Sequence, residues 1–301
     1  MKTTTLKQTK VLVTGKNGQL GHALEQVAAQ FPAFNCQFVS RESFDLGQPE
    51  QIASFLEANA FDVIINAAAY TAVDKSETET EVCDQVNHLA VKQLAEVAAA
   101  QGTKLVHVST DYVYAGESHR PYIESDPTDP QGTYGATKLA GETAMLEAMP
   151  QNGVILRTSW VYSEFGNNFV KTMLRLGSTR DQLNVVWDQI GTPTYAVDLA
   201  QAIFQIISHE SFQDQDFDSA VYHYSNEGVC SWYDFAKEIF ELSGTPCAVS
   251  PIEGKDYPTP AKRPHYSVLN KQKIKDQFKL SIGHWKDSLR LCLTALSKEK
   301  P

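Results

Sequence analysis

The first 160 residues alternate between short apolar runs and longer stretches with helical periodicity, and this alternation restricts the fold more than any other feature. The apolar runs typical of buried strands lie at 11–14, 36–40, 62–66, 104–109 and 153–157. The helical stretches lie at 20–30, 51–58, 79–100 and 134–148. Strands that alternate with helices form βαβ units with right-handed crossovers. The sequence therefore predicts an α/β fold with a Rossmann-type, doubly wound parallel sheet.

The second half of the chain has a looser pattern. Helical periodicity is present at 169–176, 197–208, 232–243 and 285–297, and short strands are expected at 184–186 and 221–225. We expect residues 1–160 to form the first domain, with later segments returning to it. Residues 161–301 are expected to form mainly a smaller α/β lobe. Asn87, a polar residue within the long predicted helix, is expected to brace the next strand.

Composition and charge narrow the classes of partner. The 301 residues carry a formal net charge of -10 without a run of Lys or Arg, which argues against a nucleic-acid partner. No apolar run approaches the roughly 20 residues that span a membrane, and segment 1–10 is polar, unlike a signal peptide. Five scattered cysteines without a C-x-x-C pair suit a reducing compartment. We therefore expect a cytoplasmic protein with no membrane partner.

Three glycines with the spacing Gly15-x-x-Gly18-x-x-Gly21 lie between the first strand and the first helix. Glycines let a backbone turn tightly and approach a pyrophosphate, which rests on the N-terminus of the helix. The spacing matches the G-x-G-x-x-G fingerprint only in part, so a purely structural turn is the alternative. The loop predicts a dinucleotide site in residues 1–160, with these contacts: Gly15, Lys16, Asn17, Gly18, Gln19 and Leu20.

The end of the second strand bears on the choice between NADPH and NADH. An acidic side chain there binds the ribose 2′-hydroxyl of NADH, whereas an arginine accommodates the 2′-phosphate of NADPH. Here the strand ends in Ser40 and Arg41, and Lys16 adds a second cation nearby. The pattern favours NADPH. A solvated surface charge is the alternative interpretation of Arg41, and Glu42 argues for NADH.

Two further segments complete the expected cofactor site. Asp45 and Leu46 follow the second strand at a position that flanks the adenine. Ala67, Ala68 and Ala69 follow the third strand, where small residues let the backbone lie flat against a dinucleotide. Close packing of a helix on the strand is the alternative role for these alanines.

Hydroxyl and carboxyl groups end the fourth strand at Ser109, Thr110 and Asp111. Ligands in open α/β sheets bind outside the carboxyl ends of the strands, where a hydroxyl can hydrogen-bond a substrate oxygen that gains negative charge. A cap or turn is the alternative role.

Tyr134 and Lys138 lie four residues apart on the next predicted helix and share one face. A neighbouring ammonium lowers the pKa of a phenol, so the pair predicts a tyrosine that exchanges protons near neutral pH.

These motifs resemble those of the extended short-chain dehydrogenase/reductase superfamily and, within it, of the dTDP-4-dehydrorhamnose reductase family. The resemblance covers nearly the whole chain. Its motifs are Gly-Gln-Leu-Gly at 18–21, Ala-Ala-Tyr-Thr-Ala-Val-Asp-Lys at 68–75, Ser-Thr-Asp-Tyr-Val-Tyr at 109–114, Tyr-Gly-Ala-Thr-Lys-Leu-Ala-Gly-Glu at 134–142, Leu-Arg-Thr-Ser-Trp-Val-Tyr at 156–162, Gly-Asn-Asn-Phe at 166–169, Asp-Gln-Ile-Gly-Thr-Pro-Thr at 188–194 and Arg-Pro at 263–264. The first and fourth occur across the superfamily, and the others are specific to the smaller family.

The resemblance implies an NADPH-dependent oxidoreductase that reduces the C4 ketone of a dTDP-linked 4-keto-6-deoxy sugar and forms dTDP-L-rhamnose. By this resemblance Tyr134 protonates the C4 oxygen, Lys138 binds the nicotinamide ribose and lowers the tyrosine pKa, and Thr110 polarises the carbonyl. The expected contacts of the sugar nucleotide are Asp111, Tyr112, Trp160, Asn168, Arg263 and segment 189–194. Arg157 and Arg263 are candidate donors to the diphosphates, with a carboxylate pair as the alternative for Arg157.

Other members of the superfamily supply the alternatives. Family members often carry an acidic residue where this chain has Ser40, so NADH remains the alternative cofactor. Some bind magnesium at a dimer interface; we match no such ligands here and predict no metal, while a homodimer is compatible with the resemblance. A 4,6-dehydratase would have Asp-Glu after the threonine, but Tyr112 follows Asp111. Two further functions are alternatives to a reductase. One is an epimerase, and the other is a regulatory NADP-binding subunit, which would not need Tyr134 and Lys138.

Overall fold

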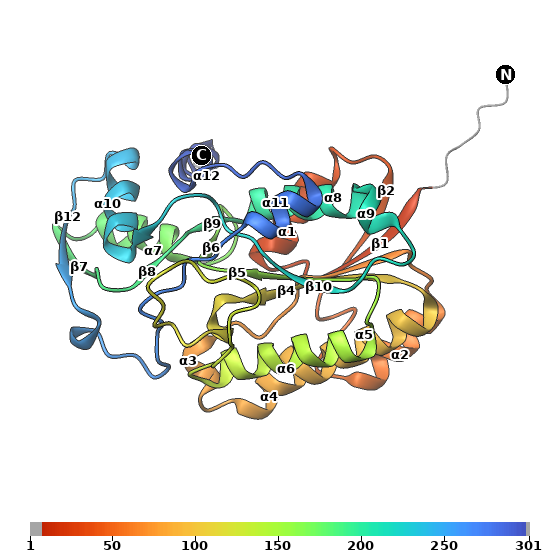
Figure 1. Cartoon of the computed structure of the whole chain (residues 1–301). Coiled ribbons are helices and arrows are strands. Elements are labelled where there is room, and N and C mark those ends of the chain that lie inside the picture. The colour runs from red at the N-terminus through yellow and green to blue at the C-terminus, as the bar shows by residue number, and fades with distance from the viewer. Residues whose placement is uncertain (1–7, 299–301) are drawn as a thin grey trace, which may run out of the picture.

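The computed structural model describes residues 8–298, so most of the polar segment 1–10 lies outside the described residues. Within them, six parallel strands form the central sheet in the order β10-β5-β4-β3-β1-β2 (Figure 1). These strands are β1 (Thr9–Thr14), β2 (Phe34–Val39), β3 (Val63–Asn66), β4 (Lys104–Thr110), β5 (Gly153–Thr158) and β10 (Ala220–His223). The strand order reverses between β1 and β3, the position at which open α/β sheets bind ligands. The predicted Rossmann-type sheet is confirmed.

Helices cover both faces of the sheet (Figure 1). One face carries α2 (Pro49–Ala58), α5 (Ala90–Gln101) and α6 (Thr133–Ala148), and the other carries α1 (Gln19–Ala28), α8 (Ala196–Ser208) and α11 (Gln272–Phe278). Strand side chains point alternately to the two faces. Accordingly Leu12 belongs to the core under α5, and Val13 belongs to the core under α8.

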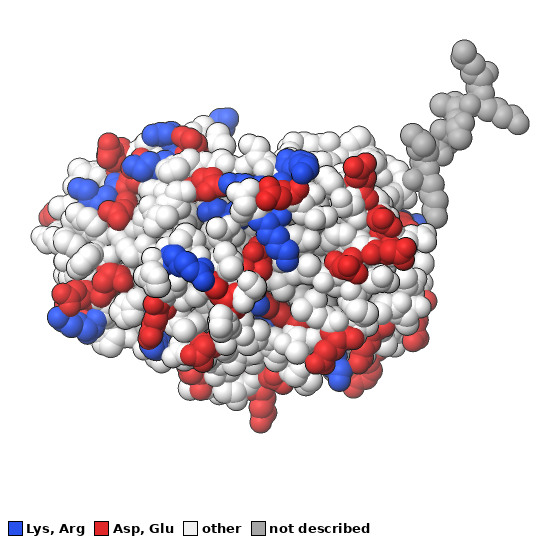
Figure 2. All heavy atoms as spheres, viewed as in Figure 1, with Lys and Arg blue, Asp and Glu red and all other residues white. Residues whose placement is uncertain are grey.

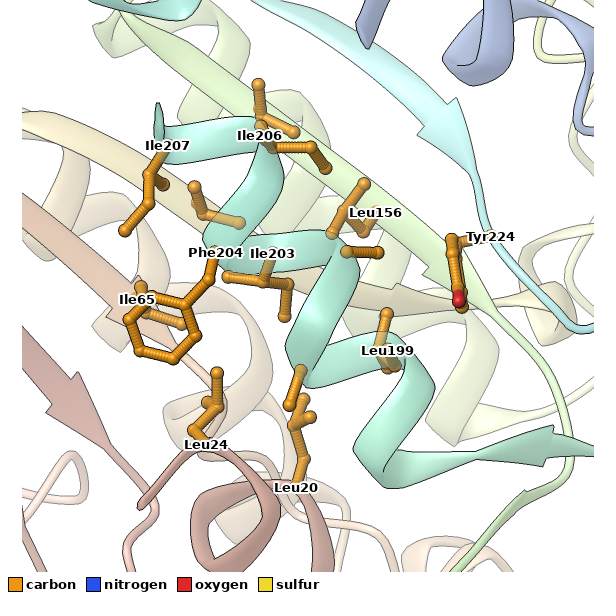
Figure 3. Packing of buried hydrophobic residues seen from close by; sticks show 14 of the residues in the cluster. Leu20, Leu24, Ile65, Leu156, Leu199, Ile203, Phe204, Ile206, Ile207 and Tyr224 are labelled. Atoms are coloured by element: carbon orange, nitrogen blue, oxygen red, sulfur yellow. The ribbon is translucent and has the colours of Figure 1, made fainter. Parts of the chain in front are cut away.

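The core between α1 and α8 fixes the start of α1. Figure 3 shows Leu20 and Leu24 of α1 beside Leu199, Ile203 and Phe204 of α8. All five side chains are buried, and each stabilises the fold by about 1.5–3 kcal/mol. Because α1 begins directly after the glycine loop, this packing holds the N-terminus of the helix at the carboxyl end of β1.

The long helix expected at 79–100 is present as a continuous helical run over 80–101, with a π-helical turn within it. The chain forms α3 (Val73–Ser76), α4 (Thr80–Asp84) and a π-helical turn (Gln85–Leu89) before α5 begins. Asn87 lies in the π-helical turn, where its Oδ1 accepts from the Tyr70 N–H at 2.9 Å and its Nδ2 donates to the Tyr70 carbonyl at 3.1 Å. The structural role expected for Asn87 is confirmed, although it holds the loop after β3 and not the next strand.

The second half of the chain builds a smaller lobe and also returns to the sheet. In the lobe, α7 (Phe169–Gly177), α10 (Trp232–Ser243) and α12 (Trp285–Lys298) pack with the parallel pair β7 (Gln182–Val186) and β12 (Ala248–Ile252). The remaining short elements are β6 (Val161–Tyr162), β8 (Ile190–Gly191), β9 (Thr194–Tyr195), α9 (Glu210–Gln213), β11 (Cys230–Ser231) and the 3₁₀ turns Asp111–Val113 and Gly254–Asp256. Because α8 and β10 belong to the layers of the sheet, the second half contributes to both parts. The domain boundary at residue 160 stays a prediction.

Charged side chains of both signs are intermixed on the face shown in Figure 2. Among residues 8–298, no helix combines the length and the apolar character needed to cross a membrane. Over the same residues, no group of three His, Cys, Asp or Glu side chains is arranged to hold a metal ion.

Candidate active site

A cleft of about 850 Å³ opens at the carboxyl ends of the sheet strands. Its wall contains these residues of the expected cofactor site: Gly15, Asn17, Gly18, Gln19, Leu20, Arg41, Asp45, Leu46, Ala67, Ala68, Ala69, Tyr134 and Lys138. It also contains Thr110, Asp111, Tyr112, Trp160 and Asn168. Lys16 differs from the others, because its ammonium lies 3.4 Å from Glu25 Oε1 on α1 and its residue is not in the wall. The fold thus joins motifs that the sequence spreads over about half of the chain.

Backbone crowding explains the glycine loop. Gly15 has a φ of +74°, and a Cβ there would lie 2.8 Å from the Ala68 nitrogen. A Cβ on Gly21 would lie 2.1 Å from the Gly15 carbonyl oxygen. Larger residues therefore do not fit at either position. Gly18 precedes α1 without a side-chain cap, so the first N–H groups of α1 remain available to an anion.

The end of β2 presents a cation to the cleft. Ser40, Arg41 and Asp45 line the wall, whereas Glu42 does not. The Ser40 hydroxyl donates to the exposed Glu42 carboxylate. Arg41 is largely exposed, with its Nε 3.5 Å from Asp45 Oδ1. An exposed guanidinium and a serine hydroxyl suit a 2′-phosphate better than a bare ribose.

Lys138 enters the cleft from α6. Its Nζ lies 2.7 Å from the Val108 carbonyl oxygen and 3.1 Å from His107 Nε2, both on β4. Burial lowers the pKa of Lys138 to about 8, and the charges of Glu142 and Cys83 oppose this shift. The side chain therefore remains mostly an ammonium at neutral pH.

Tyr134 lies one turn before Lys138 on α6, with its ring edge against Tyr112 at a centroid distance of 5.5 Å. Burial raises the pKa of Tyr134, and its hydrogen bond with Thr110 opposes the shift. The expectation that Lys138 lowers the pKa of this phenol is not met, because burial raises that pKa and the charges of Asp111 and Cys83 raise it further. The phenol is therefore protonated at neutral pH, the state that a general acid needs.

Thr110 and Asp111 form a polar pair at the end of β4. The Thr110 hydroxyl donates to Asp111 Oδ1 at 3.0 Å and accepts from the Tyr112 N–H at 3.2 Å. Asp111 is 3% exposed. Burial raises its pKa to about 6, while the hydrogen bond from Thr110 opposes the shift. An ionisable group kept in an apolar setting beside a hydroxyl is typical of a functional site.

A second cleft of about 860 Å³ adjoins the first, and Tyr112 and Trp160 line both. Trp160 has a φ of +47°, a costly conformation for a large side chain. Its ring stacks on Trp232 with a centroid distance of 3.6 Å. Trp232 and Arg263 also line this cleft. The left-handed backbone at Trp160 thus places an aromatic ring where the two clefts meet.

One expected contact of the ligands is wrong, and another is met only in part. Arg157 is buried on β5, where its Nη2 lies 2.5 Å from Glu142 Oε2, and it lines neither cleft. The carboxylate pair is therefore correct and the diphosphate role is not. In segment 189–194 only Gln189 lines the second cleft. Thr192 is buried and donates to the Gly228 carbonyl at 2.7 Å, because β8 turns inward to pair with β11.

Asn168 lines the first cleft but not the second. Its Oδ1 accepts from the Lys171 N–H at 3.1 Å and so caps α7. Its Nδ2 donates to Gln19 Oε1 at 2.9 Å, which ties α7 to the glycine loop. Its contact with a substrate stays a prediction.

Three polar residues of the site were not expected. Asp74 binds Arg263 in the wall of the second cleft, with Oδ2 2.7 Å from Nη2. The Glu77 carboxylate accepts from the Thr133 N–H at 2.9 Å and so caps α6 from 56 residues away. His107 contacts Lys138 from β4. Two of them had a sequence signal, since Asp74 lies in the motif at 68–75 and His107 is a polar residue in the middle of an apolar strand.

Residues 9–298 match the protein family described as RmlD substrate binding domain. The chain belongs to this family. A dTDP-4-dehydrorhamnose reductase from Sinorhizobium fredii is 42% identical over 294 residues, which cover 96% of this chain and 98% of the relative.

Solved structures of related enzymes agree with this membership. A dTDP-4-dehydrorhamnose reductase from Clostridium acetobutylicum has a TM-score of 0.90 and 38% identity, and covers 96% of this chain and 100% of its own. The enzyme from Bacillus anthracis, solved in complex with NADP, has a TM-score of 0.89, 34% identity and the same coverage. This RmlD family member therefore has relatives that share its fold over nearly its full length.

Proposed function

We propose that this chain is a dTDP-4-dehydrorhamnose reductase, which reduces the C4 ketone of dTDP-4-dehydro-β-L-rhamnose with NADPH and forms dTDP-β-L-rhamnose. This is the last step of dTDP-L-rhamnose biosynthesis. The observation that carries the proposal is the meeting of Thr110, Tyr134 and Lys138 in a cleft that also holds the glycine loop. Relatives at 38–42% identity with the name of this activity support it.

The residues of the first cleft fit a dinucleotide. Gly15 and Gly21 let the loop pack closely on its own backbone and on Ala67 and Ala68, and a pyrophosphate would rest on the N-terminus of α1 that follows. Arg41 and Ser40 would bind the 2′-phosphate, and the Lys138 ammonium would bind the nicotinamide ribose. When bound, NADPH supplies the hydride that C4 receives.

Side chains of the protein supply the proton for the C4 oxygen and stabilise the negative charge that forms there. Tyr134 donates its phenolic proton to the C4 oxygen as that oxygen gains negative charge. The Thr110 hydroxyl turns from Asp111 to donate to the same oxygen, which polarises the ketone beforehand. The Lys138 ammonium stabilises the phenolate left on Tyr134. Asp111, Tyr112, Trp160, Asn168 and Arg263 would hold the sugar nucleotide.

We assign the binding of the two ligands to different parts of the chain. We assign NADPH binding mainly to residues 1–160, and sugar-nucleotide binding mainly to residues 161–301. A cytoplasmic homodimer without nucleic-acid or membrane partners belongs to the same proposal.

The test is the decrease in NADPH absorbance with purified protein and dTDP-4-dehydro-β-L-rhamnose prepared in the same vessel. Stoichiometric oxidation with dTDP-β-L-rhamnose as product is expected, with NADH as a slower donor. An epimerase would bind the cofactor and interconvert sugars without net oxidation. A regulatory subunit would bind NADPH and leave the sugar unchanged, and either result would overturn the proposal.

A further inference from the structure

The Lys138 ammonium has two hydrogen-bond acceptors inside the protein, and one of them is an imidazole. Its Nζ contacts the Val108 carbonyl oxygen at 2.7 Å and His107 Nε2 at 3.1 Å. Lys138 is 1% exposed and His107 is fully buried, so their polar groups need partners inside the protein. An ammonium has three N–H donors. Two are used by β4, and the third remains for the cleft, whose wall includes Lys138.

The other ring nitrogen of His107 is engaged as well. Nδ1 lies 3.1 Å from the side-chain amide of Asn66 on β3, and the far end of that amide lies 2.7 Å from the Thr14 hydroxyl on β1. The Thr14 oxygen in turn accepts from the Ala68 N–H at 3.2 Å. A buried row of hydrogen bonds thus runs from Lys138 under the cleft to the loop that follows β3.

Donor counting in this row selects one tautomer. Burial and the Lys138 charge keep the pKa of His107 well below its ordinary value, so the ring is neutral, with one donor and one acceptor nitrogen. If Lys138 is an ammonium, Nε2 must accept and Nδ1 must carry the proton. This tautomer exchanges the amide oxygen and nitrogen of Asn66, which have nearly the same shape, so that the oxygen accepts from Nδ1–H and the nitrogen donates to the Thr14 oxygen.

We propose that His107 is a positioning residue, which holds the Lys138 ammonium at the cleft by accepting its hydrogen bond at Nε2 as the Nδ1–H tautomer. The inference rests on the proposed function in one respect, that Lys138 serves the bound cofactor. Without the imidazole, Nζ would keep only the Val108 carbonyl and would lose its fixed direction toward the cleft.

Matched variants separate positioning from packing. His107→Leu removes the acceptor, whereas His107→Gln keeps an acceptor near the position of Nε2. His223 provides the control, because it is a second fully buried histidine, on β10, bonded to the Tyr114 hydroxyl at 2.7 Å and to the Asn270 carbonyl at 3.1 Å. His223→Leu and His223→Gln therefore perturb the core without touching Lys138.

We expect His107→Leu to weaken NADPH binding and to lower kcat, each about tenfold, the usual worth of a hydrogen bond to a charged group. His107→Gln should restore most of both, and the His223 variants should change the Tm with little effect on either. The dissociation constant is read from protein fluorescence, which requires no turnover. Equal losses in His107→Leu and His107→Gln, or the same losses in the His223 pair, would overturn the proposal.

The tautomer is measured directly by nitrogen-15 NMR of histidine-labelled wild-type protein, with His107 assigned from the signal missing in His107→Gln. A protonated Nδ1 with an unprotonated, hydrogen-bonded Nε2 is expected. A protonated Nε2 at neutral pH would refute the proposal even if His107→Leu fails to fold. If wild-type protein does not oxidise NADPH, the proposed function fails while this readout still decides the inference.

Discussion

Arg263 and Asp74 form an ion pair in the wall of the second cleft, with Nη2 2.7 Å from Oδ2. Asp74 lies on α3, beside the cofactor cleft, and its Oδ1 also accepts from the Ala261 N–H at 3.3 Å. Arg263 Nη1 donates to the Tyr112 hydroxyl at 3.3 Å. The pair thus connects α3 to the loop between β12 and α11, and it keeps a guanidinium beside Tyr112, which lines both clefts.

Replacement of Arg263 should affect the sugar nucleotide and not the cofactor. A guanidinium binds a diphosphate by paired, charge-assisted hydrogen bonds. We expect Arg263→Met to raise the KM for the sugar nucleotide about 10- to 100-fold, the range for lost bonds to a charged group. The NADPH dissociation constant should stay the same. Lys262→Met is the matched control, because Lys262 is the adjacent cation and lines neither of these two clefts; an equal KM increase there would contradict the assignment.

Removal of the Tyr134 hydroxyl should abolish most turnover. The phenol is the proposed proton donor, and general acid catalysis contributes roughly 100- to 10,000-fold to a rate. We therefore expect kcat for Tyr134→Phe to fall within this range while NADPH still binds. Tyr222→Phe removes a hydroxyl from a buried tyrosine on β10, away from both cleft walls, and should leave kcat unchanged. Near-normal turnover in Tyr134→Phe would assign the proton to another group.

The sheet and the cofactor cleft were predictable because local patterns encode them. Apolar runs give strands, and parallel strands bring their carboxyl ends to one edge. The glycine loop, Ala67–Ala69, Thr110 and Tyr134 therefore had to meet once the strand order was known. Helix bounds in the second half of the chain were equally predictable, since α7, α8, α10 and α12 begin and end within one residue of the expected ranges.

The rest of the site depends on contacts between distant segments. Glu77 caps α6 across 56 residues, a distance at which no capping motif exists in sequence. The π-helical turn at Asn87 follows from the packing of the loop after β3, and helical periodicity alone does not report it. Arg157 was misassigned because a cation at a strand end looks the same whether it meets a diphosphate or a buried Glu142. Burial decides that question, and burial of a charge is not visible in sequence.

Substitution of Asp111 should stabilise the protein. Its pKa rises from 3.8 unfolded to about 6 folded, because burial disfavours the carboxylate. A folded-state pKa above the unfolded value means that the folded protein binds the proton more tightly, so the free energy of unfolding falls as the pH rises from about 4 to 6. Above pH 6 the whole penalty is present. Asp111→Asn removes it and should gain about 1–3 kcal/mol at pH 7.

The measurement for Asp111→Asn is guanidinium chloride unfolding of both proteins at pH 4, 5, 6 and 7. The difference between them should be small at pH 4 and should grow to pH 6. Because Asp111 is also a proposed substrate contact, the variant should lose activity as it gains stability, a common compromise at functional sites. A variant that is less stable than wild type at pH 7 would show that the carboxylate is well paired in the folded protein.

Loss of one partner of the buried ion pair of Arg157 and Glu142 should destabilise the protein, whereas replacement of Asp111 should stabilise it. Arg157 Nη2 lies 2.5 Å from Glu142 Oε2, and Glu142 also accepts from the Ser109 hydroxyl at 2.5 Å. Arg157→Met leaves that carboxylate without its cation, which costs about 3–5 kcal/mol for a buried pair. Arg157→Met with Glu142→Gln leaves no charge and should lose clearly less, as denaturant unfolding of the double-mutant cycle would measure. Additive losses would mean that the two side chains stabilise α6 and β5 independently, through packing and not through their charges.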